Sequence, residues 1–191
     1  IGSLSSIKKI SDTLSSGGMK ANNVTVTSYV DCLAACYLFV ECQRYDVKGK
    51  QSLTTIPKFY LTDHGFRCAL LGTKDLDFGH MYENIVAMEL LRRGYDISMG
   101  KLTEGEVDFI AASHDQQTYI QVCDDISRPD TLDRESRSLL SIRDAYPKII
   151  IARTRHEEYS VEGIRILDLA SWLLSSAGAA HQRTSGNRKP V

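Results

Sequence analysis

The stretch GHMYENIVAMELLRRGYDI, residues 79–97, decides the fold because it carries a strongly periodic helical pattern. Ile85, Met88 and Leu91 recur at three-residue spacing, which places them on one face of a helix. Gly94 predicts the end of that helix, since glycine readily adopts the conformation found just after a helix C-terminus. A helix with one apolar face must cover another layer, so its neighbours in the sequence define the architecture.

The sequence after this helix predicts a sheet. Runs rich in β-branched and aromatic residues indicate strands, and polar or glycine-containing stretches separate them. The first three candidates are YDISMGK (95–101), EVDFIAA (106–112) and TYIQVCD (118–124). Two further buried strands are KIIIA (148–152) and GIRIL (163–167). Residues 131–143 and 168–174 indicate helices, the second capped by Asp168. The expected class is α/β (α+β), a mixed sheet flanked by helices.

The sequence before the central helix predicts a smaller module. Residues 4–14 have helical periodicity that ends at Gly17-Gly18, with Ser3 or Ser5 as its cap, and residues 25–38 give a second helix with an apolar face. YLFVECQRYD (37–46) and SLTTIPKFYLTD (52–63) then flank a turn that contains Gly49, which indicates a β-hairpin. Two helices followed by a hairpin are the order of a winged helix that lacks its first helix. Because the chain begins at Ile1, we expect that helix to lie upstream.

These patterns predict three parts: a winged-helix-like module at 1–66, a sheet domain at 67–176 and a disordered tail at 177–191. The net charge of −1 predicts no overall attraction to nucleic acid or to anionic membranes. No apolar run is long enough to span a bilayer. The odd number of cysteines without a CxxC motif favours a reducing, cytoplasmic location. Cys32 and Cys36, one helical turn apart, are expected to be packing residues rather than metal ligands.

Glu83, Asp108 and Gln121 are the candidate site residues. A helix carboxylate and acidic side chains on adjacent strands are the oxygen ligands that Mg²⁺ needs for phosphodiester cleavage, with a lysine to assist the attacking water. Gln121 is neutral and Cys123 offers no fixed cation, so the pattern keeps Glu83 and Asp108 as metal ligands and lacks the lysine. The expected outcome is at most weak Mg²⁺ binding and no required cofactor.

The order of these motifs resembles the C-terminal region of archaeal and bacterial AAA-type ATPases. The matching segments of the second part are residues 79–97, 105–112, 118–126, 131–135 and 142–151, and those of the first part are residues 5–14, 25–29, 44–50 and 57–67. The resemblance implies a winged helix followed by a PD-(D/E)XK nuclease-like domain. It also implies a P-loop ATPase domain elsewhere in the parent protein, because no GxxxxGK[ST] motif occurs in this chain.

Carried over residue by residue, the resemblance places Glu83 and Asp108 at two acidic positions of the nuclease site. Gln121 and Cys123 stand at the E-x-K positions, and a glutamine at the first of these is common in the family. A degenerate, vestigial site is therefore expected. A lysine displaced from elsewhere in the sequence would restore it, with Lys101 or Lys148 as the candidates.

The winged-helix part gives a mixed prediction for DNA binding. Its second helix contains Asp31 and no Arg or Lys, which makes it a poor reader of the major groove. Four basic residues around the hairpin offer contacts to phosphates without sequence reading. They are Arg44, Lys48, Lys50 and Lys58.

Two functions from different classes follow from these observations. The first is a non-catalytic interaction module that contacts the ATPase domain of its parent protein, a DNA backbone or another copy of itself. The alternative is an active Mg²⁺-dependent DNA endonuclease with a displaced lysine. The relative positions of Glu83, Asp108, Gln121 and the nearest ammonium group discriminate between them.

Overall fold

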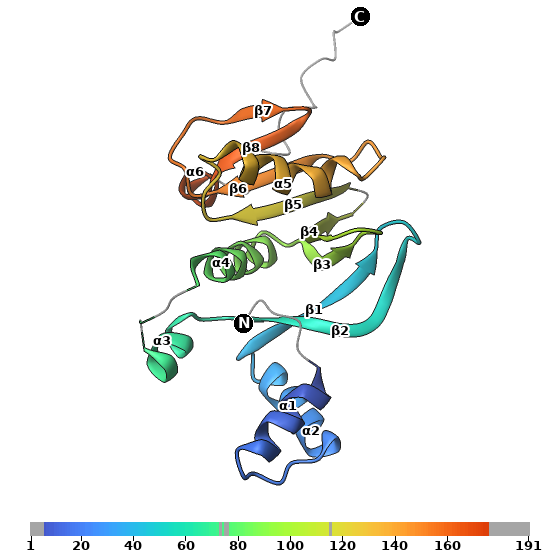
Figure 1. Cartoon of the computed structure of the whole chain (residues 1–191), viewed down its shortest axis with the longest axis vertical. Coiled ribbons are helices and arrows are strands. Elements are labelled where there is room, and N and C mark those ends of the chain that lie inside the picture. Colours follow the sequence, from blue (N-terminus) through green and yellow to red (C-terminus); the bar gives the residue numbers. More distant parts are fainter. Residues whose placement is uncertain (1–5, 73, 75–76, 115, 176–191) are drawn as a thin grey trace, which may run out of the picture.

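The computed structural model describes residues 6–72, 74, 77–114 and 116–175, and the predicted tail lies outside these residues. Its centre is a single eight-stranded sheet in the order β2-β1-β3-β4-β5-β6-β8-β7 (Figure 1). The strands are β1 (Phe39–Asp46), β2 (Gln51–Leu61), β3 (Asp96–Lys101), β4 (Glu106–Ser113), β5 (Gln116–Cys123), β6 (Lys148–Ala152), β7 (Tyr159–Val161) and β8 (Ile164–Asp168). The mixed α/β class predicted from the sequence is confirmed.

The hairpin of β1 and β2 belongs to this sheet. β1 pairs with β2 in antiparallel fashion and with β3 in parallel, through Arg44 opposite Met99. The β1–β2 register shifts between Cys42 and Arg44, close to Pro57 on the edge strand. Proline has no N–H for a strand ladder and is therefore tolerated at an edge or a bulge. The boundary expected at residue 66 therefore does not divide the chain into two separate sheets.

Two helices cover opposite faces of the sheet. α4 (Phe78–Arg92) packs on one face through Val86, Ala87 and Leu90, in the same core cluster as Phe109 of β4. α5 (Pro129–Leu140) packs on the other face through Leu139. The short α6 (Leu169–Leu174) joins the cluster of α4. Alternate residues of the central strands supply the two cores, as the two-residue period of a strand requires.

The first two helices lie beyond the β1–β2 edge of the sheet (Figure 1). α1 (Ile7–Ser16) is capped by Ser6, whose side chain accepts a hydrogen bond from the backbone N–H of Lys9, so the predicted caps Ser3 and Ser5 are wrong. α2 (Asn23–Ala35) is capped by Asn22, and Val26 is its buried residue. Most of its predicted apolar face is exposed. Cys32 and Cys36 are also exposed, so the expectation that they are packing residues is wrong.

Other elements follow the prediction with two additions. α4 ends before Gly94, which has a φ of 81°, and the side chain of Asp168 accepts the backbone N–H of Ser171 at the start of α6. The short helix α3 (Gly65–Leu71) and the edge strand β7 were not expected. None of the helices in the described part of the chain is long and apolar enough to cross a membrane.

Candidate functional site

A buried asparagine fixes the edge strand β2 against α4. The side chain of Asn84 accepts a hydrogen bond from the Leu61 N–H and donates one to the Leu61 carbonyl, both at 2.8 Å. Asn84 is fully buried, so these two bonds satisfy its amide where water cannot. The neighbouring residue on α4 is Glu83, which thereby faces the side chains of β2.

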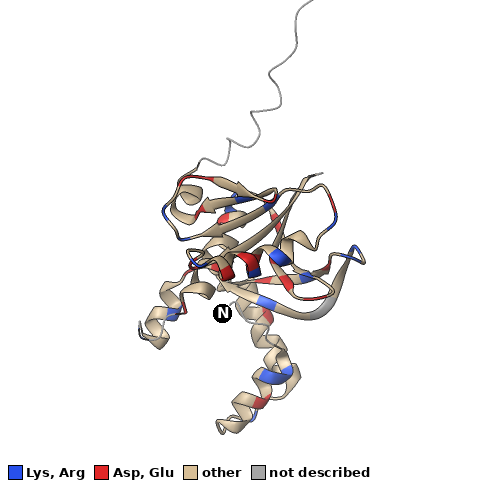
Figure 2. Ribbon diagram, turned by 45° about the horizontal axis from the view of Figure 1, so that its top comes forward, with Lys and Arg blue, Asp and Glu red and all other residues tan. Residues whose placement is uncertain are grey.

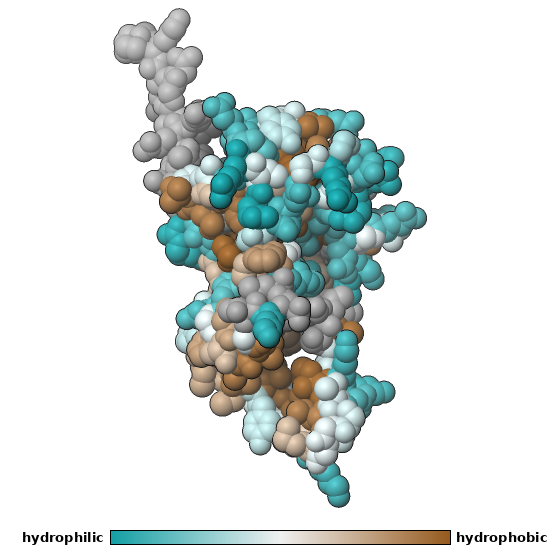
Figure 3. All heavy atoms as spheres, turned by 60° about the vertical axis from the view of Figure 1, so that its left-hand side comes forward, coloured by the Kyte–Doolittle hydropathy of each residue, from teal (hydrophilic) through white to brown (hydrophobic). Residues whose placement is uncertain are grey.

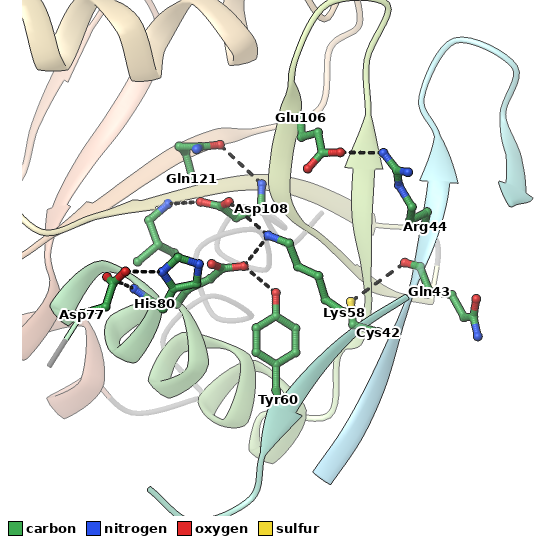
Figure 4. A network of polar contacts seen from close by, with 12 residues as sticks. Cys42, Gln43, Arg44, Lys58, Tyr60, Asp77, His80, Glu106, Asp108 and Gln121 are labelled. Atoms are coloured by element: carbon green, nitrogen blue, oxygen red, sulfur yellow. Dashed lines mark hydrogen bonds and ion pairs between the residues drawn. The ribbon is translucent and has the colours of Figure 1, made fainter. Parts of the chain in front are cut away.

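Lys58 of β2 lies between the two carboxylates predicted from the sequence. Its Nζ is 2.8 Å from Glu83 Oε1 and 4.0 Å from Asp108 Oδ1 (Figure 4). Tyr60, two residues further along β2, donates its hydroxyl to the same Oε1 of Glu83 at 2.6 Å. The second oxygen of Asp108 accepts the backbone N–H of Val122 at 2.9 Å. The helix, the edge strand and the central strands therefore meet in one polar cluster, which we call the Lys58 cluster: Lys58, Tyr60, Glu83 and Asp108.

Burial dominates the electrostatics of the Lys58 cluster. Burial, followed by repulsion from Glu83, raises the pKa of Asp108 from 3.8 to about 7, against the attraction of Lys58. Burial alone would lower the pKa of Lys58, but attraction to Glu83 and then to Asp108 outweighs it, so the net pKa is raised. Burial also raises the pKa of the Tyr60 hydroxyl, and Glu83 adds to that shift. Lys58 is thus a charged ammonium, and Tyr60 is a neutral donor, at physiological pH.

Gln121 does not join Glu83 and Asp108 as a third ligand. Its amide nitrogen donates to Glu135 of α5 at 3.0 Å, and its amide oxygen accepts the backbone N–H of Asp108 at 3.4 Å. Glu135 is also paired with Arg134 at 2.7 Å. The Cys123 thiol is buried in the core cluster on the α5 face, where burial, followed by repulsion from Glu135, raises its pKa. Gln121 therefore links β4 and β5 to α5.

Neither lysine proposed as a displaced catalytic group reaches the Lys58 cluster. Lys148 pairs with Asp144 at 3.5 Å and donates to the Asp144 carbonyl. Lys101 is an exposed residue at the end of β3. The ammonium that lies beside Glu83 and Asp108 is that of Lys58, which was expected to contact phosphates. With 8% of its surface exposed and with Glu83 as its partner, Lys58 is not available on the surface for a phosphate.

The other predicted phosphate contacts divide between the turn and the strand. Lys48 and Lys50 are exposed on the hairpin turn, where the Asp46 carboxylate accepts the backbone N–H groups of Lys48 and Gly49. Arg44 is committed to an ion pair with Glu106 of β4. Basic and acidic residues are interspersed over the ribbon and do not form one basic face (Figure 2). Of the four residues predicted to contact phosphates, only Lys48 and Lys50 on the turn are exposed.

The Lys58 cluster does not fit a divalent metal ion. Mg²⁺ takes about six oxygen ligands at roughly 2.1 Å, usually including two carboxylate groups. Here the Lys58 ammonium lies against Glu83 Oε1, and Asp108 Oδ2 is bonded to a backbone N–H. Within the described ranges, no three His, Cys, Asp or Glu side chains are placed to share one ion. The arrangement is that of a buried cation with two carboxylates.

None of Lys58, Tyr60 and Glu135 was predicted at this site from the sequence, and Lys58 was assigned to phosphate contacts instead. Strand periodicity puts Lys58 and Tyr60 on one face of β2, which is the signal that the sequence offers. This signal does not identify the partner of Lys58, because Lys58 and Glu83 are 25 positions apart in the sequence.

Comparisons with known proteins give relatives without an assigned activity. A family model described as a domain of unknown function (DUF8612) matches residues 1–77. A protein of Haemophilus influenzae with the description "Uncharacterized protein" is 38% identical over 174 residues, which are 91% of this chain and 43% of that relative. The chain thus spans less than half the length of this relative. No solved structure gives a significant match.

The family match ends where the central helix α4 begins. Its end falls at residue 77, directly before Phe78, the first residue of α4. Lys58 and Tyr60 lie inside the matched region, whereas Glu83 and Asp108 lie outside it. The Lys58 cluster is therefore built from both sides of this boundary.

Proposed function

We propose that this chain is the C-terminal, non-ATPase region of a P-loop ATPase and serves as an interaction module on a degenerate nuclease-like fold. The observation that carries the proposal is the position of the Lys58 ammonium, 2.8 Å from Glu83 and 4.0 Å from Asp108. A lysine here neutralises the carboxylates that a cutting enzyme would use to bind its metal ion. The cluster then holds α4, β2 and β4 together.

Charge supports this structural role. The Lys58 ammonium lies 2.8 Å from the Glu83 carboxylate, and burial, followed by repulsion from Glu83, raises the pKa of Asp108, so a second negative charge is disfavoured. A buried charge without a partner costs several kcal/mol, on the order of 3 to 5 when one member of a pair is removed. Both partners are present in this chain, so removal of either one would leave a buried charge without its counter-charge.

Exposed apolar side chains support a docking role. Tyr29, Leu33 and Tyr37 follow one another at four-residue intervals along and just after α2, and they are 64%, 41% and 79% exposed. On α3, Leu70 is 82% and Leu71 is 70% exposed. Apolar surface gathers over the end of the molecule that contains α1, α2 and α3 (Figure 3). Contiguous apolar surface marks interaction sites more often than isolated exposed residues do.

The partner that we propose for this surface is the ATPase domain of the parent protein. The alignment covers 91% of this chain, and the relative is more than twice as long. A parent protein of that length would have a further domain to cover this surface. Lys48 and Lys50 on the hairpin turn are the remaining candidates for contact with a DNA backbone. Such contacts would add affinity without sequence selectivity.

The second candidate function is a divalent-metal DNA endonuclease whose lysine comes from β2. The supporting observation is that the Lys58 ammonium lies beside two carboxylates, because the nuclease site also combines a lysine with carboxylates. The candidate requires Lys58 to leave Glu83 so that both carboxylates become available. The buried ion pair and the hydrogen bond from Tyr60 oppose that movement.

A plasmid cleavage assay discriminates between the two functions. The chain would be incubated with supercoiled plasmid and either Mg²⁺ or Mn²⁺, alongside Asp108→Ala and the control Lys101→Ala, which changes an exposed lysine outside the cluster. We expect none of the three proteins to nick the plasmid above the buffer background. Cleavage by the wild type and by Lys101→Ala that disappears in Asp108→Ala would overturn the interaction-module proposal in favour of the nuclease.

A further inference from the structure

A pocket of about 560 Å³ opens at the carboxyl ends of β5 and β6, away from the Lys58 cluster. Its walls are the loop that follows β5 and the loop that follows β6, together with the first residue of β7. We call this cavity the Arg155 pocket. Its lining residues are Asp125, Ile126, Ser127, Arg153, Thr154, Arg155, His156 and Tyr159. The volume falls within the roughly 300 to 1,000 Å³ that is typical of small-molecule sites.

The topology explains why the sheet opens at this point. β5, β6 and β8 are parallel neighbours, so their carboxyl ends meet at one edge. The loops that follow β5 and β6 therefore lie next to each other at this edge, and both line the pocket. In open α/β sheets, ligands bind outside the carboxyl ends of the strands. The pocket is at that end of β5 and β6.

The pocket contains two guanidinium groups that are incompletely paired. Arg153 uses its Nε for Asp124 at 3.1 Å. The backbone N–H of Arg155 is bonded to Asp168 at 2.7 Å, while its exposed guanidinium has no ion-pair or hydrogen-bond partner among the described residues. Arg155 has a φ of 52°, a conformation that costs free energy in a non-glycine residue and that the bond to Asp168 helps to maintain. The backbone of the loop is thus held at Arg155, and its guanidinium is available to a ligand.

The opposite part of the pocket offers an aromatic wall and hydroxyl groups. The His156 ring packs edge-on against Tyr159, with ring centroids 4.8 Å apart. His156 is held by the Thr154 hydroxyl at 2.5 Å and by the Glu157 carbonyl at 2.9 Å. On the β5 side, the Ser127 hydroxyl is hydrogen-bonded to Asp125, and this bond, with the nearby Arg128 and Arg153, lowers the pKa of that carboxyl. This side of the pocket therefore presents two aromatic rings and hydrogen-bonded polar groups.

We propose that this pocket binds a small phosphate ester of mononucleotide size. The phosphate would be bound by the guanidinium groups of Arg153 and Arg155, since the planar fork of arginine matches phosphate oxygens. Tyr159 would contact a planar ring on the ligand. Asp125, which carries a negative charge, disfavours a highly charged polyphosphate and so favours a monoester. This inference is independent of the proposed ATPase context and of the fate of the Lys58 cluster.

Calorimetric titration of the chain with adenosine monophosphate tests the proposal. Adenosine, inorganic phosphate and a short single-stranded oligonucleotide would be titrated in parallel, so that ring, phosphate and nucleic-acid backbone are compared. Arg155→Gln removes the unpaired charge, and Arg143→Gln is its matched control, because Arg143 is exposed but precedes β6, whereas the pocket follows the end of that strand. Both changes keep a long polar side chain.

We expect adenosine monophosphate to bind the wild type and Arg143→Gln equally. Its affinity should fall about tenfold in Arg155→Gln, which corresponds to the loss of one charge-assisted contact of about 1.4 kcal/mol. Adenosine without the phosphate should bind at least about tenfold more weakly than the monophosphate. Equal binding by Arg155→Gln, equal binding of adenosine, or binding of the oligonucleotide alone would each overturn the proposal.

Discussion

The Lys58 cluster and the Arg155 pocket both place basic side chains beside acidic ones, yet their charges are used in opposite ways. In the cluster, Lys58 is 8% exposed and bonded to Glu83. Tyr60 donates to the same Glu83 oxygen, and a backbone N–H binds Asp108. In the pocket, the Arg155 guanidinium is exposed and lacks a partner among the described residues. The first arrangement satisfies its own charges, and the second leaves a charge for a ligand.

The difference teaches how to separate structural from binding residues when their types are the same. A buried cation surrounded by acceptors stabilises the fold, because its removal leaves carboxylates buried without a counter-charge. An exposed and unpaired cation contributes little to folding. Substitution of the lysine should therefore change the free energy of unfolding, and substitution of the arginine should change ligand affinity alone.

The largest expected effect is that of Lys58→Met. Methionine keeps the length and apolar stem of lysine but removes the charge, so Glu83 and Asp108 face each other in a buried site without a cation. We expect the free energy of unfolding at pH 7.5 to fall by about 3 kcal/mol. Urea denaturation followed by circular dichroism would measure the change.

Two variants serve as controls for this measurement. Lys148→Met removes a lysine that pairs with Asp144 at 3.5 Å. The Asp144 side chain is 32% exposed, so water can solvate the carboxylate that is left, and the change should cost about 1 kcal/mol or less. The double variant Lys58→Met, Glu83→Gln removes the uncompensated charge as well and should recover part of the loss. A loss in Lys58→Met no larger than that in Lys148→Met would contradict the assignment of Lys58 to a structural ion pair.

An intermediate effect is expected from the titration of Asp108. Its pKa in the folded chain is about 7 rather than 3.8, so between these values the folded state binds more protons than the unfolded state. The free energy of unfolding therefore falls as the pH rises through this window, and the contribution present at low pH is lost near neutrality. Asp108→Asn does not titrate. Its stability relative to the wild type should rise by about 2 kcal/mol between pH 5 and pH 7.

Urea denaturation of both proteins at a series of pH values measures this difference. Asp144→Asn is a suitable control, because it removes a carboxylate from a half-exposed site on another part of the sheet. Its pH dependence separates the titration of Asp108 from the general effect of removing a carboxylate. A constant difference between Asp108→Asn and the wild type at all pH values would show that the pKa of Asp108 is the same in the folded and unfolded states.

Regular periodicity made most of the fold predictable. The helix ending before Gly94, the strand that contains Asp108 and the cap at Asp168 are local patterns, which a sequence records directly. The edge strand β7 is only three residues long, and α3 has seven, so neither displays a full pattern. The pairing of β1 with β3 joins residues far apart in sequence, and no local pattern encodes it.

The candidate site was predictable only in part for the same reason. Glu83 and Asp108 were found because a helix and a strand position each acidic residue in a recognisable order. Lys58 was assigned to the wing because its neighbours in sequence suggest a hairpin surface, whereas its burial follows from the Asn84 contacts that hold β2 against α4. The Arg155 pocket depends on the meeting of two loops and left no motif in the sequence.

The smallest expected effect is that of Arg155→Gln on folding. The guanidinium is exposed and unpaired within the described residues, and the backbone bond to Asp168 does not depend on the side chain. Its φ of 52° is unfavourable for glutamine as it is for arginine, so the substitution adds no new backbone strain. Thermal or urea denaturation should therefore give a free energy of unfolding within about 0.5 kcal/mol of the wild type. A loss as large as that of Lys58→Met would mean that Arg155 is a structural residue, and the contrast between the two basic sites would then rest on burial alone.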